Sequence, residues 1–582
     1  MRTLIEGGTV VDGTGGPARP ADVCIDGDRI ASIGTDLAKR FAPDVVIDAH
    51  GQIVAPGFID LHTHYDAQLF WDPDASPSPL HGVTTVLGGN CGFSLAPCGP
   101  EDVDYLSRMM ARVEGMPLAA LRAGLTWDWT SFGDWLGRLD GNLGVNAGFL
   151  VGHSTLRRLV MGSRAVGTAA TENDLVAMEA ALDAALSDGA LGWSTSQVHT
   201  HNDGDGQPVP SRAASWAELE RLARVVSHHP GTTVELIVAG CLNGFSDEDI
   251  DLLSAISMLA DRPVNWNVLG VSAANPEGVW SQLAASTEAA ERGATLVALT
   301  LPHTMQIRLS FEHGAILDGL PGWRELFALA PAQRMAALSD PTTRKALDEG
   351  AQSEAAGILR HLAVWSRLVV EETFAEENAG LEGQSVGAIA KRRGVSPFDA
   401  LADIVVADEL RTGLRPPIPE SEEDWALRAQ VWADPRAIVG GSDAGAHLDT
   451  MCGAIYSTAL LGDGVRKRSL LSWTAAIRQL TDIPARLYGL RDRGRLVAGA
   501  YADVVVFDPT TIGHGAVRTK DDLPGGASRL YAEAEGITHV LVNGVEIVRD
   551  GRFSGARPGT CLRAGIDTDT VHAGADWINA ER

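Results

Sequence analysis

The sequence has few cysteines, few basic residues relative to acidic ones and no long hydrophobic run, and each shortage excludes a class of protein. Six scattered cysteines in 582 residues cannot build a disulfide scaffold, which favours a reducing compartment. The 47 Lys and Arg residues against 75 Asp and Glu give a formal net charge of -28, so nucleic acid and anionic membranes are not expected partners. Because no stretch reaches the roughly 18 apolar residues of a membrane span and no apolar targeting segment starts the chain, we expect a cytoplasmic protein. The oligomeric state stays open, a homo-oligomer included.

Both ends of the chain consist of short alternating runs separated by Gly, Asp and Pro turns. Residues 2–56 have this texture, and it returns in GRLVAGAYADVVVFD and THVLVNGVEIVRDGRF near the other end. Alternation with turn residues between the runs is typical of antiparallel strands. We therefore predict a small β-sandwich domain assembled from residues 1–56 and 490–582, with two unrelated β segments as the alternative.

The middle of the chain, residues 57–489, contains eight apolar, β-branched runs that each close on polar residues, with amphipathic helical stretches between most of them. The runs are IVAPGFIDL, GVTTVLGGN, VNAGFLVG, GALGWSTS, TTVELIVAG, PVNWNVLG, ATLVALTLP and RAIVGGS. Such a pattern predicts an α/β protein with a (β/α)8 TIM barrel, whose parallel strands are buried. Active sites of this fold lie at the carboxyl ends of the strands, so the closing polar residues become catalytic candidates.

A long segment separates the seventh run from the eighth. Residues 304–435 are helical in pattern and rich in charge and tryptophan. We predict a helical insertion between barrel strands seven and eight, because a connection of that length is far longer than an ordinary barrel loop. It could act as a lid over the barrel mouth, or form an extra helical subdomain without that role.

The most informative motif is Asp60-Leu61-His62-Thr63-His64 at the end of the first run. Residues two apart on a strand point to the same side, so His62 and His64 can both reach one divalent metal ion. The eighth run ends in Gly441-Ser442-Asp443, and this aspartate could ligate the same ion and take a proton from its water. We therefore predict His62, His64 and Asp443 as metal ligands, with Asp443 also catalytic.

Several motifs together resemble the amidohydrolase superfamily, and more narrowly its D-aminoacylase (N-acyl-D-amino-acid deacylase) branch. They are PGFIDLHTHYDA, GVTTVLGGNCGFSLAP, FLVGHSTLR, GGSDAGAH and GRLVAGAYADVVVFD. The resemblance covers nearly the whole chain. The resemblance implies a zinc-dependent hydrolase of amide bonds, in which water activated by the metal attacks the acyl carbonyl. It also implies that Cys91, the cysteine of GNCG, is a zinc ligand; packing as a buried free cysteine is the alternative.

The chain departs from that family at the fifth and sixth barrel strands. The family places a metal-binding histidine on each, but the fifth run here reads Thr232-Thr233-Val234-Glu235-Leu236 and the sixth, PVNWNVLG, has no histidine either. Glu235 stands near the missing fifth-strand ligand and could replace it, because zinc accepts carboxylate oxygen. We expect one zinc ion per chain, held by His62, His64 and Asp443, with Cys91 and Glu235 as further ligands.

Two candidate substrate-binding residues lie near the end of the third barrel strand. His153 closes that strand and is a candidate substrate contact, with a structural hydrogen bond as the alternative. Arg157, four residues later, could hold a substrate carboxylate in a bidentate pair. The expected substrate is a small linear N-acyl amide, an N-acyl (D-)amino acid above all. Alternatives are an Nε-acyl-lysine or a cyclic amide as substrate, or a catalytically degenerate barrel that serves as a binding or scaffold protein.

Overall fold

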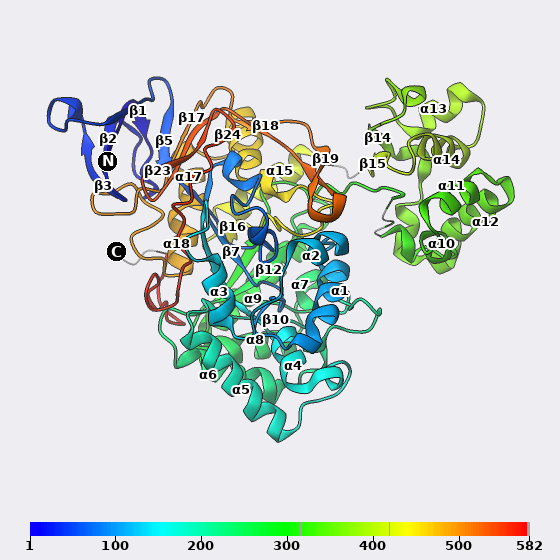
Figure 1. Cartoon of the computed structure of the whole chain (residues 1–582), viewed down its shortest axis with the longest axis horizontal. Helices are drawn as coiled ribbons and strands as arrows, with labels where there is room; N and C mark the ends of the chain where they lie inside the picture. The colour runs from blue at the N-terminus through cyan, green and yellow to red at the C-terminus, as the bar shows by residue number, and fades with distance from the viewer. Residues whose placement is uncertain (313, 315, 418–419, 579–582) are drawn as a thin grey trace.

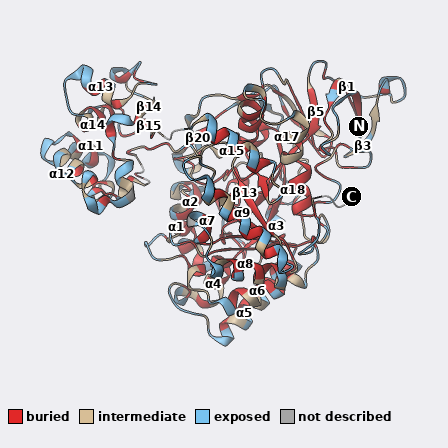
Figure 2. Ribbon diagram, turned by 180° about the vertical axis from the view of Figure 1, so that it is seen from behind, coloured by how far each residue is buried: buried red, intermediate tan, exposed pale blue. Residues whose placement is uncertain are grey.

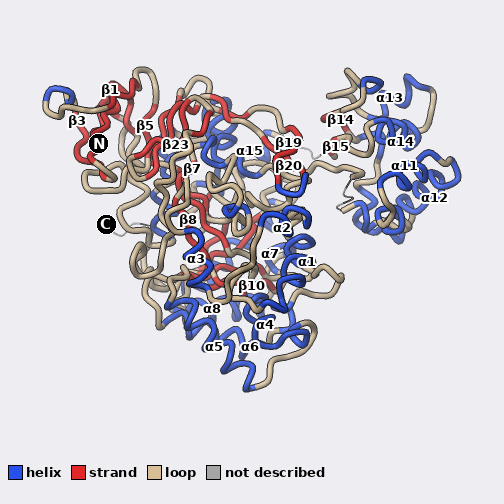
Figure 3. Tube along the Cα trace, viewed as in Figure 1, coloured by secondary structure: helices blue, strands red, loops and turns tan. Residues whose placement is uncertain are grey.

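The computed structural model describes residues 1–312, 314, 316–417 and 420–578. Residues 313, 315, 418–419 and 579–582, which belong to the predicted insertion and the predicted terminal domain, lie outside the described residues. Figure 1 shows a central body of strands and helices, a sheet near the N-terminus and a helical segment that stands to one side. Strands and helices alternate through the body (Figure 3), which confirms the predicted α/β class.

Parallel strands form the interior of the body and follow the predicted runs in chain order. They are β6 (Phe58–Asp60), β7 (Val83–Gly88), β8 (Asn146–Phe149), β9 (Val151–Gly152), β10 (Gly192–Ser196), β11 (Thr233–Ile237), β12 (Val264–Leu269), β13 (Leu296–Thr300) and β16 (Ala437–Val439). One sheet has the order β6-β7-β8 and the other β16-β13-β12-β11-β10-β9, while β8 and β9 are one predicted run with a single residue between them. A parallel bridge between Thr63 and Ala444 links the segments that follow β6 and β16. The carboxyl ends of the first and last strands are therefore neighbours.

Helices of the body lie outside these strands, and Figure 2 shows their inner sides buried and their outer sides exposed. They are α1 (Val103–Val113), α2 (Leu118–Gly124), α3 (Phe132–Leu139), α4 (His153–Met161), α5 (Glu172–Ser187), α6 (Trp216–Ser227), α7 (Gly240–Asn243), α8 (Asp247–Ala260), α9 (Pro276–Glu291), α15 (Glu422–Trp432), α16 (Tyr456–Ala459), α17 (Trp473–Leu480) and α18 (Asp482–Leu487). Capping boxes at Thr171, Ser246 and Ser421 fix where α5, α8 and α15 begin, because each side chain accepts from the third backbone N–H of its helix. Across the part of the chain that the structure describes, no helix is both long and apolar enough to cross a membrane.

Strands from both ends of the chain pair in one nine-stranded sheet of order β24-β23-β22-β17-β5-β1-β2-β3, with β4 beside β1. The first set is β1 (Arg2–Val10), β2 (Arg19–Asp26), β3 (Arg29–Gly34), β4 (Val45–Asp48) and β5 (Ile53–Pro56), and the second is β17 (Val504–Phe507), β22 (Ile537–Val542), β23 (Val545–Arg549) and β24 (Arg552–Phe553). The two sets meet where β17 runs antiparallel to β5. β1 pairs with β4 in its first half and with β5 at its end, and its register against β2 shifts between Ile5 and Gly8. Such an irregularity bends a strand, so one continuous sheet can cover two sides of a small core.

Three two-stranded antiparallel sheets and a group of helices complete the chain. The sheets pair β14 (Val369–Glu372) with β15 (Gly413–Arg415), β18 (Gly513–His514) with β21 (Ala534–Glu535), and β19 (Arg518–Leu523) with β20 (Ala527–Tyr531). The first of these sheets lies in the helical segment, together with α10 (Trp323–Phe327), α11 (Pro331–Ser339), α12 (Pro341–Gln352), α13 (Val386–Arg393) and α14 (Pro397–Ala407). This segment has a hydrophobic core of its own, with buried residues from Leu309 to Leu414. Trp425 and Trp432 of α15 belong instead to the core of the body.

The separate core of this segment leads to a stability prediction. Trp323 is fully buried, its Nε1 donates to Leu347 O at 3.0 Å, and its ring stacks on Trp365 with centroids 5.4 Å apart. Trp323→Ala should destabilise the segment by about 3–5 kcal/mol, the usual result of removing a large buried aromatic side chain. Limited proteolysis should then cut between residues 309 and 415 while the body stays intact.

Val395, which is 41% exposed on the same segment, supplies the control. Val395→Ala should change stability by less than about 0.5 kcal/mol and leave the proteolytic pattern unchanged. Cleavage of the body and the segment at equal rates in Trp323→Ala would contradict the independence of the two cores.

Candidate active site

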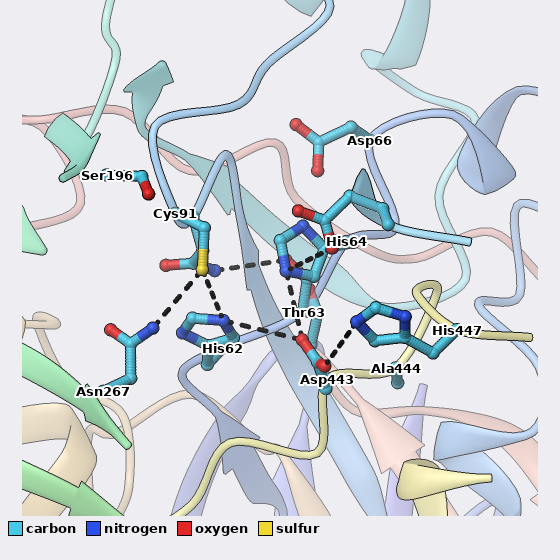
Figure 4. A network of polar contacts seen from close by, with 12 residues as sticks. His62, Thr63, His64, Asp66, Cys91, Ser196, Asn267, Asp443, Ala444 and His447 are labelled. Carbon is cyan, nitrogen blue, oxygen red and sulfur yellow. Dashed lines mark hydrogen bonds and ion pairs between the residues drawn. The ribbon is translucent and has the colours of Figure 1, made fainter. Parts of the chain in front are cut away.

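The segments that follow β6 and β16 are joined side by side at the carboxyl end of the parallel strands. His64 N donates to Ala444 O at 2.7 Å, and Asp443 N donates to His62 O at 3.0 Å. Because His62 and His64 are two residues apart on an extended segment, both rings face the same region, with centroids 5.3 Å apart. Figure 4 shows the two rings beside the carboxylate of Asp443.

Cys91 reaches the same region from the turn after β7. Gly89 in this turn has a φ of 74°, and a Cβ there would lie 2.1 Å from Leu150 O, so the close approach requires glycine. Cys91 itself has a φ of 56°, an uncommon conformation for a residue with a side chain and one that costs about 1–3 kcal/mol. Its backbone N–H donates to Glu235 Oε2 at 2.7 Å, which offsets part of this strain. The thiol lies 3.5 Å from His62 Nε2.

The spacing of these side-chain atoms fits a zinc ion. Neighbouring ligand atoms of a tetrahedral zinc site lie about 3.3–3.6 Å apart, given bonds of roughly 2.0–2.3 Å. Cys91 Sγ and His62 Nε2 are 3.5 Å apart, and Asp443 Oδ1 is 3.6 Å from His62 Nε2 and 3.1 Å from His64 Nε2. Ligand atoms of His62, His64 and Cys91 all lie within 4.8 Å of one another. The structure thus brings together four of the five predicted ligands.

Electrostatics at this cluster favour a cation. Burial lowers the pKa of His62 to about 3 despite the charge of Asp443, so the ring is neutral, as a metal ligand must be. Burial also acts to lower the pKa of His64, but the carboxylates of Glu114 and Asp443 outweigh it and raise that pKa to about 10. Burial raises the pKa of Cys91 well above that of a free thiol. A divalent ion would stabilise the thiolate and both carboxylates together.

Glu235 was predicted to replace the missing fifth-strand ligand, and the structure corrects this placement. Its Oε1 lies 3.8 Å from Nδ1 of His62, whereas Nε2 of the same ring faces Cys91 and Asp443. Neither group of candidate ligands in the described part of the chain includes Glu235. Glu235 instead supports the turn of Cys91 by accepting from the backbone N–H of that residue, and Asn267 from β12 donates to Cys91 Sγ at 3.3 Å.

His153 and Arg157 are also corrected, because both lie in a separate buried network. His153 Nε2 lies 2.9 Å from Glu218 Oε1, and its Nδ1 lies 2.8 Å from Thr195 Oγ1. Arg157 donates from Nη1 to both carboxylate oxygens of Glu218 at 2.5 Å. His153, Arg157 and Glu218 are completely buried, so none can contact a substrate in this conformation. For His153, the structure therefore favours the alternative named from the sequence, a structural hydrogen bond.

Two residues of the cluster escaped the sequence analysis. Glu114, at the end of α1, places Oε2 3.4 Å from His64 Nε2, and no periodic or motif signal points to it. His447 Nε2 lies 3.6 Å from Asp443 Oδ2 (Figure 4), and its place four residues after Asp443 in GGSDAGAH was an available signal. The site is therefore richer in histidine and carboxylate than the motifs alone indicate.

Two adjoining cavities reach this cluster. One, of about 430 Å³, is lined by Ser442 and Asp443, by the β18–β19 region and by the base of the helical segment. The other, of about 590 Å³, is lined by His201 and His447 and by the end of α1. Met305 and Ile307 line both cavities, so the two cavities adjoin, but Asp443 lines only the one of about 430 Å³.

The chain is similar to known proteins over nearly its whole length. The sequence profile of the amidohydrolase family matches residues 45–548. N-acyl-D-glutamate deacylase of Alcaligenes xylosoxydans xylosoxydans is 32% identical over 579 residues, which cover 96% of each chain. D-aminoacylase of the same organism is 27% identical over 562 residues, which cover 96% of this chain and 97% of that protein.

A solved structure is similar over nearly the same length. The crystal structure of N-acyl-D-glutamate deacylase from Bordetella bronchiseptica, complexed with zinc and a phosphonate mimic of the tetrahedral intermediate, aligns with a TM-score of 0.64 at 27% identity. The alignment covers 97% of this chain and 99% of that one.

Proposed function

Because the chain belongs to the amidohydrolase family and is a metal-dependent hydrolase of carbon–nitrogen amide bonds, we propose that it hydrolyses a linear N-acyl amide, most simply an N-acyl-D-amino acid. Its resemblance to the D-aminoacylase branch is confirmed over almost the whole chain. The observation that carries the proposal is the convergence of His62, His64, Cys91 and Asp443 at the strand ends. The same comparisons favour an enzyme over the degenerate scaffold barrel.

We further propose zinc as the metal, one ion per chain, held by His62, His64, Cys91 and Asp443. When bound, zinc would act as a Lewis acid that makes a water nucleophilic at neutral pH and polarises the acyl carbonyl. Glu235 would hold the turn of Cys91 through the backbone N–H of that residue instead of acting as a ligand.

Asp443 is the residue proposed to move the proton. Its side chain is 25% exposed, more than those of His62 and His64, and it faces the cavity of about 430 Å³. Burial raises its pKa, but the hydrogen bond and charge of His64 outweigh burial and lower it, so the carboxylate is ionised and able to accept. Asp443 would accept a proton as water oxygen bonds to the acyl carbon, then pass it to the nitrogen as the C–N bond breaks.

The two cavities support a substrate with two arms. An acyl group and an amine-side group leave the scissile bond in different directions, and one cavity is lined by Asp443 while the other is lined by its neighbour His447. A linear amide fits this arrangement. Nε-acyl-lysines and cyclic amides stay as alternatives for the substrate test.

We propose the following architecture for this site. The parallel strands close into a (β/α)8 barrel within residues 57–489, and residues 1–56 and 490–582 form the composite β domain. We keep the insertion at residues 304–435 and propose that it has two parts, a segment with its own core from Leu309 to Leu414 and α15, which packs on the body. The role of the insertion as a lid stays a prediction. It is supported by Glu371 and Arg415 at the base of the insertion, which line the cavity of about 430 Å³.

Metal analysis combined with a substrate panel tests the proposal. The full-length protein should lose hydrolysis when treated with a chelator and regain it with about one equivalent of zinc. The panel would contain N-acetyl amino acids of both configurations, Nε-acetyl-lysine and a hydantoin, followed by release of amine. We expect the N-acetyl-D-amino acids to be hydrolysed fastest.

Two histidine variants make the result specific. His62→Ala should lose both zinc and hydrolysis, whereas His50→Ala, at a surface histidine whose side chain is 70% exposed, should retain both. No hydrolysis of any N-acyl amino acid by the zinc-loaded protein would overturn the proposed substrate class.

A further inference from the structure

His201 is a half-buried histidine that the proposed zinc site does not use. It belongs to the loop between β10 and α6, whose sequence SQVHTHNDGDGQPVPS contains a second pair of histidines two residues apart. Asp203, only 1% exposed, holds this loop together, because its carboxylate accepts from the backbone N–H of Gln207 at 2.9 Å and from the hydroxyl of Tyr105 at 3.0 Å. The loop is therefore tied to α1 where it forms a wall of the cavity of about 590 Å³.

Ser196 holds the ring of His201 beside the turn that carries Cys91. Ser196 is the last residue of β10, and a Cβ on Gly92 would lie 2.9 Å from its backbone nitrogen, so the strand end and the turn are in contact. Figure 4 shows Ser196 near the segment that carries Cys91. Its Oγ lies 2.8 Å from Nδ1 of His201, and the ring of Phe93 packs on the imidazole with centroids 5.5 Å apart. His201 is thus placed at the carboxyl end of the barrel strands.

The contact with Ser196 determines which ring nitrogen of His201 carries the proton. Ser196 is fully buried, and within the described part of the chain Nδ1 is the only hydrogen-bond partner of its Oγ. A buried hydroxyl donates its proton wherever an acceptor is in reach, so Nδ1 accepts. Burial lowers the pKa of His201 to about 4, and the charges of His447 and His64 act in the same direction, so the ring is neutral at pH 7. A neutral imidazole has one N–H, which here is Nε2–H.

Nε2 of His201 is the polar atom that this arrangement leaves for a ligand. It has no hydrogen-bond partner among the described residues, and the side chain lines the cavity of about 590 Å³ together with His447. Nε2 of His447 lies 3.6 Å from Oδ2 of Asp443, which lines the adjoining cavity. Neither group of candidate metal ligands in the described part of the chain includes His201. His201 therefore offers a donor to a ligand near Asp443 without acting as a metal ligand.

We propose that His201 is a further catalytic residue, which donates from Nε2–H to the acyl oxygen as that oxygen gains negative charge in the transition state. The inference rests on the proposed amide hydrolysis, because an attacked acyl carbonyl develops this charge. A fixed neutral donor stabilises the charge without reorganisation during the reaction. The bond between Nε2 and its hydrogen stays intact, so Asp443 retains the whole proton transfer. Ser196 is a positioning residue, which keeps the proton on Nε2.

Two substitutions at His201 separate the donor from the packing of the ring. His201→Phe keeps an aromatic ring against Phe93 but has no donor. It should lower kcat for the best substrate of the panel by about 10²-fold, the usual cost of removing one oxyanion donor, with KM changed by less than about threefold and zinc content unchanged. His201→Gln can donate from its amide and should stay within about tenfold of the unaltered enzyme. His199→Ala, at the exposed histidine of the same pair, is the matched control and should change none of these values.

Binding of methylphosphonate to the zinc-loaded, full-length protein gives a readout that requires no turnover. This tetrahedral anion carries its charge on oxygen, as the attacked carbonyl does. Calorimetry should show binding to His201→Phe weakened by at least about tenfold, the worth of one hydrogen bond to a charged group. Ser196→Ala leaves the ring in place but allows the proton to move to Nδ1, so it should weaken binding by about threefold. This variant tests the donor even if His201→Phe does not fold.

Three results would overturn the inference. They are equal methylphosphonate affinity in folded His201→Phe and Ser196→Ala proteins, no methylphosphonate binding by the unaltered protein, and loss of zinc from His201→Phe. Failure of the proposed function has a different signature, namely no hydrolysis of the N-acyl amino acids while methylphosphonate binding still depends on His201. That result would assign the same donor to the carbonyl of another substrate.

Discussion

Asp443→Asn is expected to lower kcat/KM for an N-acyl amino acid by about 10³-fold or more. The substitution keeps the shape of the side chain but removes the charge that faces His62 and His64 and the group that accepts the proton. Loss of general acid–base catalysis alone costs about 10²–10⁴-fold, and the loss of a metal ligand adds to it. Steady-state hydrolysis and zinc content, measured on the same preparation, would give both effects.

Asp521→Asn, at an exposed aspartate of β19, is the matched control and should retain full activity. The melting temperature of Asp443→Asn should stay near that of the unaltered protein once zinc is removed from both. Residual activity within about tenfold of the unaltered enzyme would assign the proton transfer to another group at the site.

Glu218→Gln is expected to destabilise the fold strongly without altering the chemistry of the folded enzyme. Glu218 accepts both bonds from Arg157 Nη1 and contacts His153, and all three side chains are completely buried. Glutamine keeps the volume but leaves the guanidinium without its counter-charge in the interior, which costs about 3–5 kcal/mol. Urea or thermal unfolding would measure the loss, and kcat/KM below the transition should be unchanged.

Glu172→Gln provides a comparison at the protein surface. Glu172 also pairs with an arginine, Arg221, but its side chain is 73% exposed, so the change should amount to less than about 1 kcal/mol. A Glu218→Gln protein of normal stability with a raised KM would instead restore the substrate-binding role first predicted for Arg157.

Part of the candidate site could be predicted from the sequence. His62, His64 and Asp443 were accessible because alternation on a strand and the strand ends of a barrel fix where such side chains point. Cys91 required the family resemblance, since a buried cysteine has no distinctive pattern of its own.

The remaining placements depend on contacts between distant elements. Arg157 follows closely on a strand end, but it lies in the interior because it pairs there with Glu218 of α6, more than sixty residues further along the chain. Glu114 joins the site only because the end of α1 docks on His447. The α/β class and the alternation of runs follow from local periodicity, whereas the division of the first run into β5 and β6 depends on β17, which arrives from the other end of the chain.

The pairing of β17 with β5 can form only late in biosynthesis. Val54 of β5 meets Val506 of β17, so the edge of β5 has no partner until about 450 further residues have been made. At about 5–20 residues per second this wait lasts roughly 20–90 s. During that time a nascent chain presents an apolar, unpaired strand, the kind of edge that leads to aggregation. Slower, cooler expression and early binding of chaperones should therefore raise the yield of folded protein, and a truncation at either end would leave the other end's strands exposed.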